Sequence, residues 1–176
     1  YENPVALILA GGSGSRLWPV SSPALPKPLH PFFGTPPLLE QTLDRIAPLF
    51  PRERIFVATP LHLVATVSAC VDIPPSNIIA CECADTAAAV LHAHDVLSKR
   101  AAEAPILRLP SDHIITDTDA FRDALSRALT AFNETGTFTV IGTTPTTPNP
   151  HLGYIRYTPS PTNATFPVTS FIEKPH

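Results

Sequence analysis

The chain has 176 residues, of which 44% are hydrophobic and 15% are charged, and its formal net charge is -3. A chain of this length can bury about 70% of the surface that it exposes when unfolded, so it can fold without a metal or a disulfide bond. The slightly acidic balance excludes the basic surface that proteins need to bind nucleic acids.

Short apolar runs alternate with amphipathic segments along the first hundred residues. Residues 5–10 are continuously apolar and lead directly into glycines, which predicts a strand buried on both faces. The periodicity then predicts a helix at 38–46 ended by Pro48 and Pro51, a strand at 54–59, a helix at 61–69, a strand at 77–81 and a helix at 86–100. In the last of these helices, we expect one inward stripe of Ala87, Val90, Leu91, His94 and Leu97.

The alternation continues in the second half of the chain. It predicts a strand at 105–109, a helix at 116–133 that Gly136 ends, and strands at 138–141, 154–158 and 168–172. Asp117 or Asp119 is expected to cap the helix, whose inward face comprises Phe121, Ala124, Leu125, Ala128, Leu129 and Phe132.

Repeated strand–helix units predict an α/β fold, a Rossmann-like, doubly wound and mostly parallel sheet with helices on both faces. We expect residues 1–176 to form a single domain. Ligands of such sheets bind beyond the carboxyl ends of the strands, so the loops that begin near Gly11, Pro110 and Gly142 are the candidates for a site.

A glycine-rich loop follows the first strand and carries a cationic side chain, Arg16. Glycines let a backbone approach phosphate oxygens, and an arginine adds two parallel donors, so the loop is a candidate triphosphate site. An ordinary tight turn is the alternative. The Gly-Lys-Ser/Thr ending of a P-loop is absent, and Leu17 replaces the third glycine of a dinucleotide fold, which leaves NAD binding as a weak alternative.

Lys27 and Asp112 are the next candidates. Lys27 lies between two prolines, which would stiffen the loop and aim the ammonium at phosphate charge, although a surface lysine in a proline-rich loop has the same pattern. Asp112 follows a predicted strand, where a carboxylate could hold Mg²⁺ against phosphate oxygens or could simply begin a turn. His113 is expected to be structural, because Mg²⁺ prefers oxygen ligands.

The end of the chain reads Phe171-Ile172-Glu173-Lys174-Pro175. Strand alternation places Phe171 and Glu173 on one face and Lys174 on the other. Lys174 could reach a sugar phosphate and Glu173 the sugar hydroxyls, whereas an ion pair on an edge strand is the simpler interpretation.

Five motifs together resemble the mannose-1-phosphate guanylyltransferase family, within the sugar-1-phosphate nucleotidyltransferases. They span nearly the whole chain, and their sequences resemble those of the bacterial guanylyltransferases more than those of the uridylyl-, thymidylyl- and adenylyltransferases. The motifs are LAGGSGSRLWP at 9–19, PK at 26–27, LPSDHII at 109–115, GYI at 153–155 and FIEKP at 171–175.

The resemblance implies GTP and mannose-1-phosphate as substrates, with GDP-mannose and pyrophosphate as products. It implies catalytic roles for Arg16, Lys27 and Asp112, with Asp112 also binding Mg²⁺. It further implies a sugar-phosphate site at Gly153, Glu173 and Lys174 and a nucleotide site comprising Leu9, Ala10, Gly11, Gly12, Ser13, Gly14, Ser15, Arg16, Lys27, Thr86 and Asp112. The fold implied is that of the nucleotide-diphospho-sugar transferases.

The chain departs from the family's pattern in three places. Ala84-Asp85-Thr86 replaces an Arg-Asn-Thr stretch, and His151-Leu152 replaces the first Gly-Tyr of Gly-Tyr-Gly-Tyr-Ile. The family continues beyond the FIEKP motif with further sugar-site strands and a second metal-binding aspartate, so we expect this domain to be truncated on its C-terminal side.

Two other functions stay open: transfer of a UTP, dTTP or ATP nucleotide to a sugar phosphate, and a non-catalytic, nucleotide-sugar-binding regulatory subunit. Three cysteines without a Cys-x-x-Cys pair, and the lack of an apolar run of roughly 18 residues, lead us to expect a soluble, cytoplasmic protein with no nucleic-acid or membrane partner. The oligomeric state is open, with a homodimer among the options.

Overall fold

The computed structural model describes residues 3–12, 17–32, 36–82, 86–160 and 165–175. The chain divides into two compact units, Tyr1–Arg122 and Asp123–His176. Whether the two belong to one domain stays a prediction. Helix α4 (Thr118–Thr135) begins in the first unit and ends in the second. Within the described part of the chain, no helix has the length and apolar character needed to cross a membrane.

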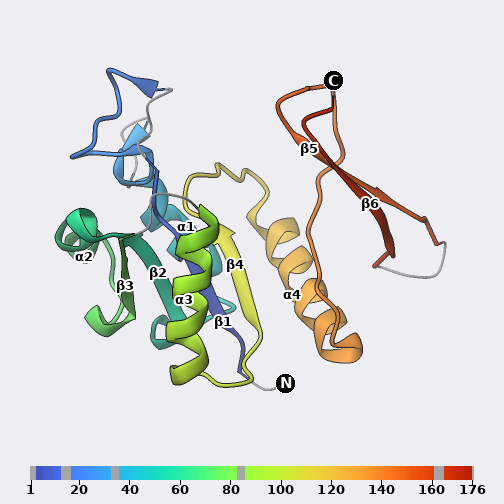
Figure 1. Cartoon of the computed structure of the whole chain (residues 1–176), viewed down its shortest axis with the longest axis horizontal. Coiled ribbons are helices and arrows are strands. Elements are labelled where there is room, and N and C mark those ends of the chain that lie inside the picture. The colour runs from blue at the N-terminus through green and yellow to red at the C-terminus, as the bar shows by residue number, and fades with distance from the viewer. Residues whose placement is uncertain (1–2, 13–16, 33–35, 83–85, 161–164, 176) are drawn as a thin grey trace. The chain divides into compact units, whose positions relative to one another are not determined.

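The first unit contains a parallel sheet of four strands in the order β3-β2-β1-β4 (Figure 1). The chain adds β2 and β3 on one side of β1 and then crosses back to place β4 on the other side. The strand order therefore reverses between β1 and β4, and α/β sheets bind ligands at such a reversal. The strands are β1 (Val5–Leu9), β2 (Ile55–Pro60), β3 (Ile78–Cys81) and β4 (Ile106–Pro110).

Helices cover both faces of this sheet, because right-handed crossovers change face where the strand order reverses. Figure 1 shows α3 (Thr86–Arg100) in front of the sheet and α1 (Leu38–Ile46) behind it. One face of β1 packs against α3 through Val5 and Leu7, and its other face buries Ala6 and Ile8. The first unit also contains α2 (Val64–Cys70), which follows the short 3-10 turn Leu61–Leu63.

The expected inward stripe of α3 is confirmed at Leu97 but wrong at Ala87, Leu91 and His94, which are exposed. Leu91 is 71% exposed, whereas Ala93 and Leu97 are fully buried. Ala89 and Val96 pack against the same cluster, so the stripe consists largely of small residues at spacings of three and four. Small side chains let the helix lie close to the sheet, and the larger Leu91 is left on the outer surface.

The N-terminus of α4 is capped by Asp117, because the backbone N–H of Ala120 donates to Asp117 Oδ1 at 2.9 Å. Asp119 instead forms an ion pair with Arg122, at 2.9 Å. At the other end, Gly136 has a φ of 65° and donates its N–H to the carbonyl of Phe132, at 2.7 Å. The predicted cap by one of the two aspartates and the predicted stop at Gly136 are both confirmed.

The second unit contains an antiparallel pair, β5 (Gly153–Tyr157) and β6 (Val168–Glu173), with an irregularity at Arg156/Tyr157. The predicted strand at 138–141 is wrong, because this segment has no strand conformation and Phe138 is 89% exposed. An apolar run becomes a strand only beside a backbone that accepts its hydrogen bonds. Among the described residues, no strand pairs with it.

Candidate active site

The carboxyl ends of β1 and β4 lie side by side, with Leu9 opposite Pro110 in the sheet register. Each strand leads into a loop that the sequence singled out: Gly11-Gly12 after β1 and Ser111-Asp112 after β4. This edge of the sheet is therefore the place where the predicted phosphate loop and the predicted carboxylate come together in the first unit.

An ion pair joins two of the predicted residues across this edge. Lys27 Nζ lies 2.9 Å from Asp112 Oδ2, although the two residues are 85 positions apart in the chain. Their side chains are 37% and 36% exposed, so both heads are accessible to a ligand from solvent. The pair concentrates one cation and one anion beside the glycine loop.

The local backbone explains why Lys27 is held in place. It begins the 3-10 turn Lys27–Leu29, in which Pro28 and Leu29 are buried. Leu29 donates its N–H to the carbonyl of Pro26, at 2.9 Å. The prolines restrict φ on both sides of the lysine, and the stiffening that the Pro-Lys-Pro sequence predicts stays a prediction.

The start of the glycine loop is fixed by the neighbouring strands. The hydroxyl of Ser111 donates to the carbonyl of Leu9 at 2.6 Å, and that of Thr59 donates to the carbonyl of Ala10 at 2.9 Å. Both hydroxyl residues are buried, and neither was predicted as part of the site. Gly12 follows with a φ of 121°, a conformation that side chains other than that of glycine rarely adopt.

Several predicted nucleotide-site residues lie outside the described part of the chain. These are the glycine-loop residues Ser13, Gly14, Ser15 and Arg16, together with the side chain of Thr86.

Arg45 is a site neighbour that the sequence interpretation missed. Its Nη2 donates to the backbone carbonyl of His113, at 3.1 Å, in the loop that carries Asp112. Burial of the guanidinium, followed by repulsion from Arg122, lowers the pKa of Arg45. A seven-residue spacing from Leu38 places Arg45 on the buried face of α1, and this was the signal that could have revealed it.

The predicted sugar-phosphate residues meet in the second unit. Gly153 pairs with Glu173 in the β5–β6 register, and a Cβ placed on Gly153 would lie 2.6 Å from Phe171 Cζ and 2.8 Å from Glu173 Oε2. Phe171 and Glu173 therefore share one face, as predicted. Lys174 does not continue the alternation, because its φ of 45° ends the strand and its Nζ lies 3.2 Å from Glu173 Oε1.

A cavity of about 570 Å³ lies at the opposite, amino-terminal edge of the first sheet. Asn3, Val5, Arg54, Arg100 and Glu103 are among the residues that line it, and none of the predicted site residues does. Parallel sheets bind their ligands at the carboxyl edge, so we place the candidate site at Lys27 and Asp112 rather than at this cavity.

Known proteins similar to this chain include two curated relatives and one solved structure. Xanthan biosynthesis protein XanB of Xanthomonas campestris is 36% identical over 96% of this chain and 36% of that protein. Mannose-1-phosphate guanylyltransferase of Escherichia coli is 31% identical over 96% of this chain and 37% of that protein. The crystal structure of mannose-1-phosphate geranyltransferase from Thermus thermophilus is 39% identical, with a TM-score of 0.88 over 98% of this chain and 50% of that one.

The chain thus spans half or less of the length of these similar proteins. The structural likeness confirms the predicted fold class, a parallel sheet with helices of the nucleotide-diphospho-sugar transferase type. The model of the nucleotidyl transferase family matches residues 5–176, and the chain belongs to that family.

Proposed function

We propose that the protein transfers guanylate from GTP to mannose-1-phosphate and releases GDP-mannose and pyrophosphate. The observation that carries the proposal is the Lys27–Asp112 ion pair beside the Gly11-Gly12 loop, where the strand order reverses. A mannose-1-phosphate guanylyltransferase among the similar proteins supports the choice of substrates.

In this proposal, the first unit holds the nucleotide. The end of β1 and its loop, from Leu9 to Arg16, contact the base and the phosphates, and Thr86 adds a further contact. Lys27 donates hydrogen bonds to triphosphate oxygens, with Arg16 as a second cation. The part of Lys27 is to offset negative charge rather than to move a proton.

The chemistry needs no general base. A sugar-1-phosphate is a phosphate monoester with a second pKa of about 6, so its oxygen is already largely ionised at neutral pH. This oxygen attacks the α-phosphorus of GTP, the new phosphorus–oxygen bond forms, and the bond to pyrophosphate breaks in line. The residues contribute positioning and charge neutralisation, which are the main terms in phosphoryl-group transfer.

Asp112 fits the requirements of a magnesium ligand. Mg²⁺ is commonly held by one or two carboxylates together with water and substrate phosphate oxygens, and Asp112 offers a carboxylate that is 36% exposed. The described residues contain no group of three or more His, Cys, Asp or Glu side chains suited to a metal, which is consistent with most ligands coming from the nucleotide and water. When bound, Mg²⁺ would neutralise charge on the phosphate oxygens.

The second unit supplies the acceptor contacts in the same proposal. Gly153 lets the side chains of Phe171 and Glu173 lie close over β5, Glu173 accepts hydrogen bonds from mannose hydroxyls, and Lys174 contacts the sugar phosphate. The Glu173–Lys174 pair is well exposed, with side chains at 58% and 64%, so both groups are available to a ligand. The simpler interpretation, an edge-strand ion pair, is also present, because Lys174 Nζ lies 3.2 Å from Glu173 Oε1.

A single assay tests the proposed function. The protein is incubated with Mg²⁺ and mannose-1-phosphate, each of the four nucleoside triphosphates is supplied in turn at equal concentration, and pyrophosphate release is measured. We expect release with GTP and about tenfold less, or lower still, with UTP, dTTP or ATP. Preference for another triphosphate would assign a different sugar nucleotide. GTP binding without any pyrophosphate release would favour a regulatory subunit.

A further inference from the structure

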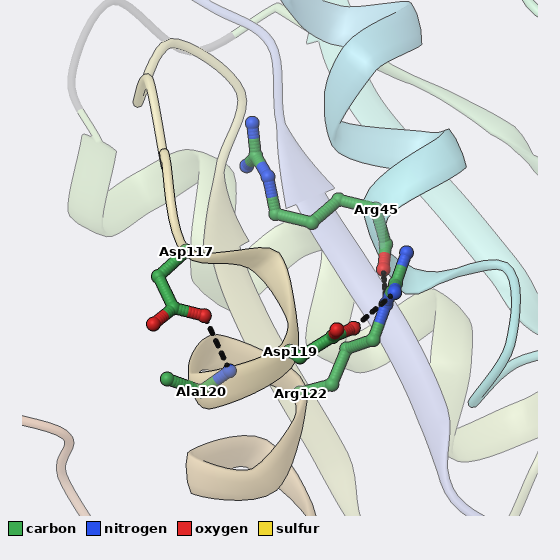
Figure 2. Close-up of polar contacts among 5 residues, drawn as sticks. All are labelled: Arg45, Asp117, Asp119, Ala120 and Arg122. Carbon is green, nitrogen blue, oxygen red and sulfur yellow. Dashed lines mark hydrogen bonds and ion pairs between the residues drawn. The ribbon is translucent and has the colours of Figure 1, made fainter.

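Arg45 lies where it can control the loop that carries Asp112. The residue is in the last turn of α1 and is only 6% exposed. Its Nη2 donates to the carbonyl of His113, the residue directly after Asp112, at 3.1 Å. Figure 2 shows the side chain extending from α1 toward the loop that follows β4.

The same arginine also contacts the far end of this loop. Its guanidinium carbon lies 5.7 Å from the centre of the Phe121 ring, in the first turns of α4. Its backbone carbonyl accepts a hydrogen bond from Arg122 Nε at 2.8 Å, and Arg122 is itself held by Asp119 (Figure 2). Arg45 therefore contacts the 111–117 loop at His113 and the first turns of the helix that follows the loop at Phe121 and Arg122.

An arginine used only for packing would be a poor choice at this position. Burying a cation is costly unless it is paired, and no carboxylate in the described part of the chain forms an ion pair with Arg45. A carbonyl and a ring are its side-chain partners there. The contacts with the His113 carbonyl and the Phe121 ring offset this cost, and the same contacts hold the loop. A guanidinium can make both at once, because it is planar and can donate a hydrogen bond while facing a ring.

We propose that Arg45 is a positioning residue, which holds the 111–117 loop so that Asp112 stays in reach of Lys27 and of a bound nucleotide. This inference rests on the proposed nucleotidyl transfer, for which Asp112 is a catalytic residue. Arg45 acts through the loop backbone. Its effect should therefore fall mainly on turnover, since a small displacement of a catalytic group can lower a rate by about a hundredfold.

The test compares Arg45→Met and Arg45→Lys with Arg52→Met in the whole protein. Arg52 pairs with Asp44 at 2.9 Å and lies in the 3-10 turn after α1, so its variant removes an arginine from the same region without touching the loop. We expect turnover in Arg45→Met to fall about ten- to a hundredfold, with the KM for GTP changing less than turnover. Arg45→Lys should recover part of the loss, because a lysine can still donate to the His113 carbonyl.

Hydrogen exchange at the backbone amides of residues 111–117 supplies a readout that needs no substrate. We expect faster exchange there in Arg45→Met and unchanged exchange in Arg52→Met. A folded Arg45→Met protein with wild-type exchange at these amides would overturn the inference, and so would wild-type turnover. If no triphosphate supports transfer in the wild-type protein, the proposed function fails, and the exchange comparison still decides whether Arg45 orders the loop.

Discussion

Replacing Lys27 with alanine should separate the small contribution of its ion pair to stability from its larger proposed contribution to catalysis. The pair with Asp112 is 2.9 Å long, but both side chains are more than a third exposed. Exposed pairs of this kind contribute about 0.2 to 1 kcal/mol to folding. In a chain of this size, such a loss lowers the melting temperature by at most about 4 °C.

The expected effect on turnover is much larger. Removing one preorganised donor to a charged transition state typically lowers the rate by about a hundred- to a thousandfold, or roughly 2.7 to 4 kcal/mol. Lys27 lies between two prolines and its Nζ pairs with Asp112 at the carboxyl edge of the sheet, so a water molecule in the alanine variant would not reproduce its charge. We therefore expect turnover to fall by about two orders of magnitude while the protein stays folded.

Lys99→Ala is the matched control. Lys99 also pairs with an aspartate, Asp95, at 2.7 Å, and its removal changes the net charge equally. It lies in the last turn of α3, away from the candidate site. Pyrophosphate release and thermal unfolding are measured for both variants. Wild-type turnover in folded Lys27→Ala would refute the assignment of Lys27, as would an equal loss in the control.

Two further substitutions address the metal and the glycine loop. Asp112→Asn keeps the shape of the side chain but removes its charge, so the Mg²⁺ concentration for half-maximal activity should rise about tenfold or more. Asp44→Asn is the control and should leave this concentration unchanged. Equal magnesium titrations for the two variants would mean that Asp112 does not bind the metal. Gly12→Ala forces alanine into a φ of 121°, which costs about 1 to 3 kcal/mol. Calorimetric titration should show weaker GTP binding, whereas Gly136→Ala, also at positive φ, should alter only stability.

The two central strands, β1 and β2, were predictable because they are buried on both faces. Residues 5–10 are a continuous apolar run and residues 55–58 are another, and the structure places β1 and β2 within one residue of the bounds predicted for these strands. The prolines after α1 and the capping aspartate before α4 also acted locally, within a few residues of the boundary that they set. Local signals of this kind do not depend on the tertiary fold.

The errors arose where tertiary packing decides the outcome. Periodicity placed Leu91 in the inward stripe of α3, but a close approach to the sheet favours Ala93 over Leu91 at the contact. The run at 138–141 has strand composition, yet a strand also needs a neighbour, and composition cannot supply that information. Both errors therefore concern contacts between segments rather than the character of a single segment.

The candidate site also contains some residues that could be predicted from the sequence and others that depend on tertiary contacts. The residues that carry charge at the ends of strands, Lys27 and Asp112, could be selected from the sequence, but their 2.9 Å contact depends on the strand order. The hydroxyls of Thr59 and Ser111 hold carbonyls at the end of β1, and Arg45 holds the loop that carries Asp112. Their partners are backbone atoms, which have no sequence signature, so these contacts could be found only in the structure, although the helical spacing from Leu38 could have marked Arg45 as buried.

Gly153→Ala tests the proposed acceptor site through crowding rather than through loss of a charge. The added Cβ would lie 2.6 Å from Phe171 Cζ and 2.8 Å from Glu173 Oε2, so both side chains must move. Because Phe171 and the Glu173 side chain are 61% and 58% exposed, they can swing outward, and the β5–β6 pairing should survive with a stability loss of about 0.5 kcal/mol. The displaced carboxylate can then no longer bind a sugar from its original position. We expect the KM for mannose-1-phosphate to rise about tenfold or more, which is the loss expected for one hydrogen bond to a charged group. The KM for GTP should be unchanged.

Gly142→Ala is the control, since its Cβ would meet only Ile155 Cδ1 at 3.4 Å. An unchanged KM for mannose-1-phosphate in Gly153→Ala would mean that the face shared by Phe171 and Glu173 does not bind the sugar.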